Sequence, residues 1–235
     1  MLVFFFFISV HSAAFHDNAG FDLYARTTIE SFYSYIESGA FRVGNYTVEK
    51  KRDQLYLNGK KHTLEDLPLS FGENYKYTIK KITEEGGRRT FKVYLHEDSC
   101  IIFNFVERFL FIKVFGNFKD FSDSVGLLGE YSTGAMLDRD GSLMSDFEEF
   151  GFAWQVNPRK DPMLFRNPRA PQLPDEKCRM PSSTSRTSRR MLRANNKLLQ
   201  DAKAACEAAN QDGNYFDLCV DDIVATGDFV LAHGW

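Results

Sequence analysis

Short runs in which apolar and polar residues alternate fill the chain from residue 21 to residue 156. Such alternation places every second side chain on the same face of a strand, so these runs predict β-strands with one buried face. Turn dipeptides separate the runs, at Asn58-Gly59, Gly86-Gly87 and Glu107-Arg108. Asn-Gly is a strong hairpin signal, because a type I′ turn needs positive φ at both central residues. The pattern predicts a mainly β fold, an antiparallel β-sandwich over residues 15–156.

After residue 156 the pattern changes twice. Residues 157–193 are rich in Pro, Ser and Arg, which predicts a linker whose first half packs along the sandwich. Residues 194–230 have apolar positions at helical spacing, first from Leu198 to Ala209 and then from Phe216 to Val224. Asp212-Gly213 ends the first run and Gly227 ends the second, so this segment predicts a short helical hairpin.

Four cysteines are present, Cys100, Cys178, Cys206 and Cys219. No Cys-x-x-Cys pair or histidine cluster accompanies them, which favours disulfides over a zinc site, with free buried thiols as the alternative. Cys206 and Cys219 have twelve residues between them in one compact segment, so we expect them to pair. Cys100 with Cys178 follows by elimination. So small a hairpin needs its bridge, or a host surface, to be stable.

The first fourteen residues, MLVFFFFISVHSAA, form an apolar run followed by small residues. Ser12 and Ala14 stand at positions −3 and −1 for cleavage before Phe15, so residues 1–14 predict a secretory signal peptide. A truncated start or a buried strand is the alternative, because no Lys or Arg precedes the run. A membrane-spanning helix needs about 20 apolar residues, which neither this run nor residues 101–115 supplies without interruption.

A phenylalanine-rich strand, a Gly-Leu-Leu-Gly turn, a polar loop and a Gly-x-x-Trp-x-Val strand follow one another from Phe109 to Val156. This order resembles the signature of the von Willebrand factor type D (VWD) domain, with family positions occupied by Gly126, Gly129, Asp138, Gly151, Trp154 and Val156. The resemblance implies an extracellular β-sandwich that serves as a structural, adhesive or assembly module. The segment from Cys219 to Asp228 is similar to the cysteine-paired region that trails type D domains.

The chain departs from the family pattern at two places. Leu128 stands where most members have a disulfide-bonded cysteine. Many members also bind calcium in the following loop, but here Met136 and Leu137 occupy positions where oxygen ligands are expected. The resemblance therefore implies no cofactor beyond a partial calcium site at Asp138 and Asp140, with a solvated Asp-Gly turn as the alternative.

Composition and motifs narrow the function classes. The net charge of −3 gives no whole-protein field for nucleic acid or an anionic membrane. No Gly-x-Ser-x-Gly, His-Glu-x-x-His or Gly-rich phosphate motif is present, so we predict no enzyme. The main alternative is a secreted hydrolase, which would bring together in one pocket two or more of His62, His96, Asp123 and Glu130. A second alternative is polyanion binding through the basic linker at residues 177–197, which also holds the dibasic pair Arg189-Arg190 as a candidate cleavage site.

Together these observations predict a secreted or cell-surface protein with no catalytic residue. Its expected partners are other extracellular proteins or further copies of itself. Asn45-Tyr46-Thr47 is the chain's one N-x-S/T sequence, so Asn45 is the candidate glycosylation site.

Overall fold

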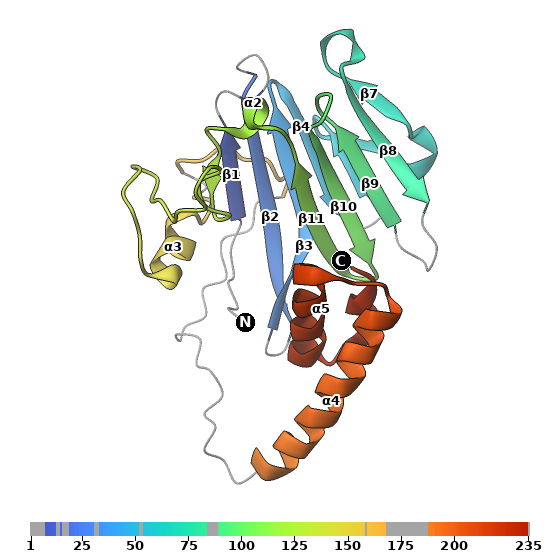
Figure 1. Cartoon of the computed structure of the whole chain (residues 1–235). Helices are drawn as coiled ribbons and strands as arrows, with labels where there is room; N and C mark the ends of the chain where they lie inside the picture. The colour runs from blue at the N-terminus through green and yellow to red at the C-terminus, as the bar shows by residue number, and fades with distance from the viewer. Residues whose placement is uncertain are drawn as a thin grey trace.

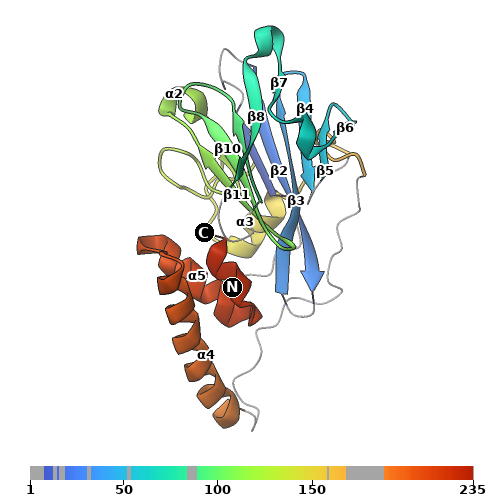
Figure 2. The same ribbon diagram turned by 90° about the vertical axis from the view of Figure 1, so that its right-hand side faces the viewer.

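The computed structural model describes residues 8–12, 15, 19–30, 33–51, 54–83, 89–157, 159–167 and 188–234. In these residues one antiparallel sheet of seven strands and one of five stack face to face (Figures 1 and 2). The sheets share one apolar core, which confirms the predicted mainly β fold.

The seven-stranded sheet is built around two long central strands, β2 and β3. In spatial order its strands are β12 (Val125–Gly126), β1 (Ile8–Ser12), β2 (Phe21–Glu30), β3 (Tyr33–Val43), β4 (Tyr46–Lys51), β5 (Gln54–Leu57) and β6 (Lys60–His62). The turn between β5 and β6 has positive φ at both Asn58 and Gly59, as the Asn-Gly signal predicts.

Strand β1 coincides with the predicted signal segment. It pairs with β2 on one side and with β12 on the other. Residues 8–12 therefore form a strand, which was one of the alternatives to a signal peptide. Phe15, the residue that would follow the cleavage site, is fully buried between the rings of Phe21 and Phe121. Residues 1–7 lie outside the described part of the chain, and cleavage before Phe15 stays a prediction.

The five-stranded sheet is a regular antiparallel meander. Its strands, in spatial order, are β11 (Phe109–Phe115), β10 (Cys100–Val106), β9 (Arg89–Tyr94), β8 (Tyr77–Thr83) and β7 (Leu69–Phe71). The predicted turn between β10 and β11 is present, with Glu107 at a φ of 52°. The Gly86-Gly87 turn lies outside the described residues.

Phenylalanine rings from both sheets fill the space between them. Phe41 of β3 stacks on Phe103 of β10 with ring centroids 6.2 Å apart. Beside them, a Cβ atom on Gly39 would lie 2.6 Å from the Phe103 ring, so the close approach of the sheets at this point requires glycine. Because strand side chains alternate, residues between these inward rings face the opposite side of each sheet.

Two short helices lie in the connections that follow β11. Helix α2 spans Phe118–Phe121 and helix α3 spans Phe147–Ala153, while 3-10 turns η1 (Leu64–Asp66) and η2 (Glu73–Tyr75) flank β7. Helix α3 corrects the expectation of a strand before Trp154. The Asp146 side chain accepts a hydrogen bond from the Glu149 backbone N–H at 2.8 Å, and such a cap favours a helix at this position.

The C-terminal residues form the predicted helical hairpin. Helix α4 spans Ser188–Ala208, beginning before the expected residue 194, and α5 spans Gly213–Thr226. Gly227 ends α5 in the left-handed conformation, with a φ of 73°, as predicted. The turn η4 (Phe229–His233) completes a small apolar cluster in which the hairpin packs against Phe109 and Phe111 of β11. Within the described residues, no helix combines the length and apolarity needed to cross a membrane.

Residues 156–157 and 159–167 lie on the outer face of the seven-stranded sheet. Val156, Leu164 and Phe165 pack there against Tyr24 and Ala40. This is the packing predicted for the first half of the linker. Its remainder, up to residue 187, lies outside the described part of the chain.

Candidate functional site

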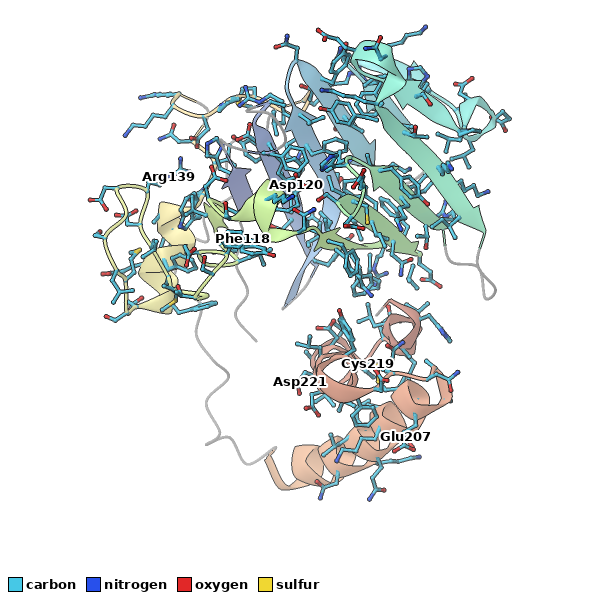
Figure 3. The ribbon with its side chains drawn as sticks, turned by 45° about the horizontal axis from the view of Figure 1, so that its top comes forward. Phe118, Asp120, Arg139, Glu207, Cys219 and Asp221 are labelled. Atoms are coloured by element: carbon cyan, nitrogen blue, oxygen red, sulfur yellow. A yellow bond between two sulfur atoms is a disulfide. The ribbon has the colours of Figure 1, made fainter. Side chains whose placement is uncertain are left out.

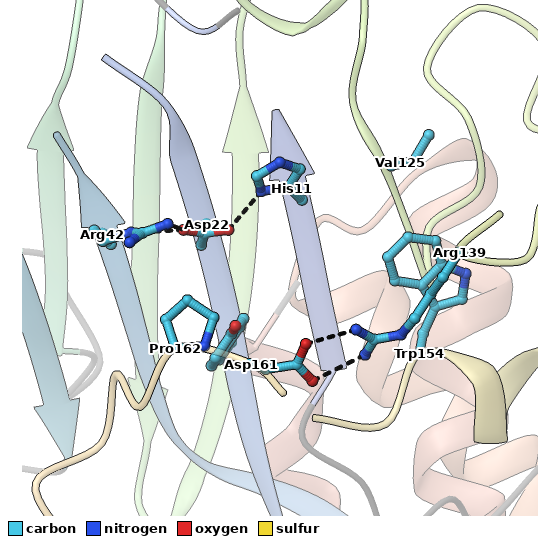
Figure 4. Close-up of a pocket in the computed structure, with 9 residues that line it drawn as sticks. His11, Asp22, Arg42, Val125, Arg139, Trp154, Asp161 and Pro162 are labelled. Atoms are coloured by element: carbon cyan, nitrogen blue, oxygen red, sulfur yellow. Dashed lines mark hydrogen bonds and ion pairs between the residues drawn. The ribbon is translucent and has the colours of Figure 1, made fainter. Parts of the chain in front are cut away.

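A pocket of about 290 Å³ lies on the outer face of the seven-stranded sheet (Figure 4). Strands β1, β2 and β3 contribute His11, Asp22, Tyr24 and Arg42. The opposite side is formed by β12 and the residues around α3, which contribute Val125, Arg139, Trp154, Asp161 and Pro162. Segments far apart in the chain thus meet at this pocket.

The sheet side of the pocket is a three-residue charge network centred on Asp22. The Asp22 carboxylate lies 2.6 Å from His11 Nδ1 and accepts a hydrogen bond of 2.7 Å from Arg42 Nε. Burial alone would raise the pKa of Asp22, but the bonds and charges of His11 and Arg42 outweigh it and hold that pKa below its usual value. The hydrogen bond to Asp22 raises the pKa of His11, so this imidazole is favoured in its protonated form.

The network makes stability depend on pH in a defined direction. Because the folded-state pKa of His11 is raised, its contribution is fully present below pH about 6.5 and is lost as the pH rises through the raised value. We expect His11→Asn to lower the melting temperature most at pH 5, with the difference from wild type fading as the pH rises through the raised pKa of His11. His233→Asn, an exposed histidine outside the pocket, is the control. A difference that grows with pH would contradict the assigned pairing.

The opposite side of the pocket is organised by Arg139. Its guanidinium makes a double ion pair with Asp161, with N–O distances of 2.6 and 3.1 Å. It also donates to the carbonyl oxygens of Ala153 and Gln155 and lies 5.4 Å from the Trp154 ring centroid. Arg139 therefore ties the loop after β12 to the chain on both sides of Trp154.

The pocket's ionisable groups are bound to one another. His11 is paired with the Asp22 carboxylate, which raises the pKa of His11 and favours its protonated form. Burial raises the pKa of Tyr24, so its hydroxyl stays protonated and un-ionised. Both arginines are paired with carboxylates. The arrangement is that of a polar junction between two parts of the fold.

Sequence reasoning singled out Trp154 but none of the other residues that line the pocket. The alternation of β2 places Asp22 and Tyr24 on the face opposite Phe21 and Leu23. This was the one feature of the sequence that could have pointed to these two residues. Their partners lie at unrelated distances along the chain, and no local pattern links Asp22 to Arg139.

Trp154 is buried, with 5% of its surface exposed, and forms one wall of the pocket. Its indole Nε1 donates to the Leu137 carbonyl oxygen at 2.7 Å. The chain at Leu137 therefore supplies the polar contact of the buried indole, whereas Leu128 of the Gly-Leu-Leu-Gly turn is 74% exposed.

The Gly-Leu-Leu-Gly turn begins in β12 and depends on its two glycines. The Gly129 backbone N–H donates to the Gly126 carbonyl at 2.9 Å, and both residues have positive φ. A Cβ atom on Gly129 would lie 2.7 Å from the Gly134 carbonyl oxygen. Glycine is therefore required at 129 for both conformation and space. Gly151 is a buried residue of helix α3, whereas the motif predicts a strand at this position.

The candidate calcium residues lie in one tight turn. Gly141 donates its backbone N–H to the Asp138 carbonyl, and the Asp140 carboxylate accepts from the Ser142 backbone N–H at 2.9 Å. The hydrogen bonds of Ser142 lower the pKa of Asp140. Within the described residues, no three or more His, Cys, Asp or Glu side chains gather as metal ligands would. Calcium binding at Asp138 and Asp140 stays a prediction.

The predicted Cys206–Cys219 disulfide is present and joins α4 to α5, with both cysteines fully buried. In Figure 3, Cys219 lies on the hairpin, apart from Asp120 and Arg139 of the sandwich and its loops. Cys100 is a buried free thiol at the start of β10, contrary to the bridge expected with Cys178, which lies outside the described residues. Burial raises the pKa of the Cys100 thiol, which keeps it protonated.

The candidate glycosylation site is exposed. Asn45 lies in the turn that joins β3 to β4, with its side chain in solvent. This position is accessible to a glycan, and its modification stays a prediction.

The residues named for the hydrolase alternative do not line the pocket. His96 lies 3.2 Å from both oxygens of the buried Asp120 carboxylate, and the Ser99 hydroxyl donates to that same carboxylate. In a catalytic triad the serine would instead hydrogen-bond to the histidine. His62 lies by Asp66, and the Glu130 carboxylate caps the backbone N–H groups of Ser132 and Thr133, which lowers its pKa to about 2.

No protein-family model and no curated protein sequence matches the chain.

Proposed function

We propose that this chain is an extracellular, non-catalytic module of the VWD type, which acts in structure, adhesion or assembly through its surfaces. Its partners are other extracellular proteins or further copies of the chain. The proposal joins three elements: the sandwich, the glycine turn with its buried tryptophan, and the disulfide-linked hairpin.

The observation that carries the proposal is the way the polar loop of the motif is joined to the segment around Trp154. The indole binds the Leu137 carbonyl and lies beside Arg139, whose guanidinium reaches Ala153 and Gln155. The motif thus acts as one folded unit on the sheet, which is what a structural signature requires. A reaction centre would instead need a base, a nucleophile or an open ligand position.

The hairpin supports an oxidising location. A disulfide is consistent with secretion, because cytosolic thiols are normally kept reduced. The bridge joins two helices that pack onto β11, so the hairpin belongs to the same folded body as the five-stranded sheet.

The test is expression of the full chain, with its own N-terminus, in a secretory animal cell line. We expect the protein in the medium, with a linked Cys206–Cys219 peptide in non-reducing mass mapping. The N-terminal sequence of that protein will show whether cleavage occurs before Phe15 or whether β1 is retained. Sedimentation with and without the protein's extracellular partners will report assembly.

Retention of the protein in the cytosol with Cys206 and Cys219 reduced would overturn the extracellular proposal. Hydrolysis of ester, peptide or glycoside substrates by the secreted protein, lost on His96→Ala, would overturn its non-catalytic part. Failure to assemble with itself or with any extracellular protein would remove the adhesive or assembly role.

A further inference from the structure

We infer that the outer face of the five-stranded sheet is a binding surface for a sulfated polysaccharide. The surface, named here the lysine face, comprises Lys80, Lys92, Tyr94, Lys113, Phe115 and Tyr215. The choice of a sulfated polysaccharide, among polyanions, rests on the extracellular location proposed above.

Strand register places the three lysines in one row. Lys80 of β8 lies opposite Lys92 of β9, and Ile102 of β10 lies between Lys92 and Lys113 of β11. The neighbouring positions Ile79, Val93 and Ile101 point into the core. The lysines therefore share the outer face, in a line that crosses four strands and spans about 14 Å at the usual strand spacing.

Such a row is unfavourable for the sheet by itself. Like charges directly opposite each other on neighbouring strands repel, and Lys80 with Lys92 is such a pair. Among the described residues no carboxylate is paired with either of them. Lys80 and Lys92 thus form a local concentration of positive charge on a chain whose net charge is −3. A polyanion laid along the row would remove the repulsion.

Exposed aromatic rings accompany the charges. The ammonium groups of Lys80 and Lys92 lie 5.1 and 4.8 Å from the Tyr94 ring centroid, and that of Lys113 lies 4.9 Å from the ring of Tyr215 on α5. Phe115 shares a row with Tyr94 and is 45% exposed. Aromatic rings next to lysine ammonium groups suit a polymer that has both sugar rings and anionic groups.

The helical hairpin sets the lower limit of this surface. Asn104, the next outward position on β10 after Ile102, donates to the Gly234 carbonyl at 3.0 Å, so the sheet is covered from there on. Exposed Glu97 and Asp98 follow β9 and mark the upper end. In Figure 1 the hairpin lies at the lower end of the green strands. The surface between is an open strip across the strands, which fits a linear chain.

Lysine ammonium groups pair with sulfate and with phosphate alike, and the lysine face contains no arginine. The extracellular location proposed above decides for a sulfated polysaccharide over nucleic acid. Lysine acts as a hydrated point charge, which binds spaced anionic groups without demanding one geometry. A sulfated polysaccharide meets this requirement in the extracellular space.

The test measures binding of the full chain to immobilised heparin at several salt concentrations. Lys80→Gln combined with Lys92→Gln should weaken binding by about tenfold or more and make it less sensitive to salt. The control pair Lys60→Gln with Lys61→Gln removes the same charge from exposed positions on β6 and should stay within about twofold of wild type. Thermal unfolding of the Lys80/Lys92 variant should be unchanged or raised, because repulsion is relieved.

Equal losses in the two variants, or no heparin binding by wild type, would overturn the lysine face. Unchanged binding in the Lys80/Lys92 variant would also overturn it and would assign binding to the basic segment at residues 177–197. Tighter, Lys80-dependent binding to poly(U) RNA or to phosphatidylserine vesicles would replace the polysaccharide by those partners. The secretion experiment is independent, so a cytosolic protein that binds heparin through this face would defeat the proposed function and leave the surface standing.

Discussion

Replacing Trp154 with alanine is expected to lower the free energy of unfolding by about 3–5 kcal/mol, the range for truncating a large buried aromatic. The indole is 5% exposed, and its Nε1 bond to the Leu137 carbonyl holds the loop that carries Asp138 and Arg139. Removal leaves a cavity beside the pocket and an unsatisfied carbonyl. Chemical denaturation monitored by circular dichroism will measure the loss.

Phe152 supplies a matched control for Trp154. It lies two residues earlier on helix α3 but is 52% exposed, so Phe152→Ala should cost under about 1 kcal/mol. Trp154→Phe should fall between the two variants, because the ring remains while the hydrogen bond is lost. If Trp154→Ala were no more costly than Phe152→Ala, the tryptophan would not be the anchor of this region.

Removal of the Cys206–Cys219 bridge is expected to destabilise the hairpin by roughly 3 kcal/mol, the loop-closure entropy for a chain segment of about 14 residues. The double variant Cys206→Ala with Cys219→Ala keeps both positions apolar, so the effect reports mainly the lost constraint. Hydrogen exchange of the α4 and α5 amides will show it as faster local opening, with the sheets less affected.

Cys100→Ala is the control for that experiment, since its buried thiol lies in β10 and forms no bridge in the structure. It should leave exchange in α4 and α5 near the wild-type rate. Recovery of a peptide that links Cys100 to Cys178, or to either hairpin cysteine, would contradict both the free thiol and the local bridge. Unchanged exchange in the double variant would show that packing on Phe109 and Phe111, and not the disulfide, holds the hairpin.

The lysine face and the pocket lie on different sheets and have different charge arrangements. In the pocket, Asp22 and Asp161 neutralise Arg42 and Arg139, so its charges are used within the fold. On the lysine face, Lys80 lies opposite another lysine. This contrast explains why we assign an internal role to the pocket and a binding role to the open surface.

Local chemistry made several features readable from the sequence alone. The Asn58-Gly59 turn, the end of α5 at Gly227 and the Cys206–Cys219 pair depend on neighbours close in the chain. Alternation along β2 likewise predicted which of its faces enters the core, because the strand period fixes side-chain direction. The mainly β class follows from these local rules.

Tertiary contacts decided the features that the sequence could not. Ile8–Ser12 is a strand because β2 and β12 flank it, although the same residues fit a signal peptide. Lys50 is buried, with its ammonium 3.9 Å from the Phe91 ring centroid, a placement that polarity alone argues against.

The pocket and the lysine face have the same physical origin. Both depend on which strands become neighbours and in which register, and register is a property of the assembled sheets. The sequence by itself determined the alternating strands from β2 to β11, the turns at Asn58 and Glu107 and the helical hairpin, because each of these is fixed over a few residues. Only the tertiary structure brought Asp22 near Arg139 and Lys80 opposite Lys92, because free energy summed over both sheets selects those pairings.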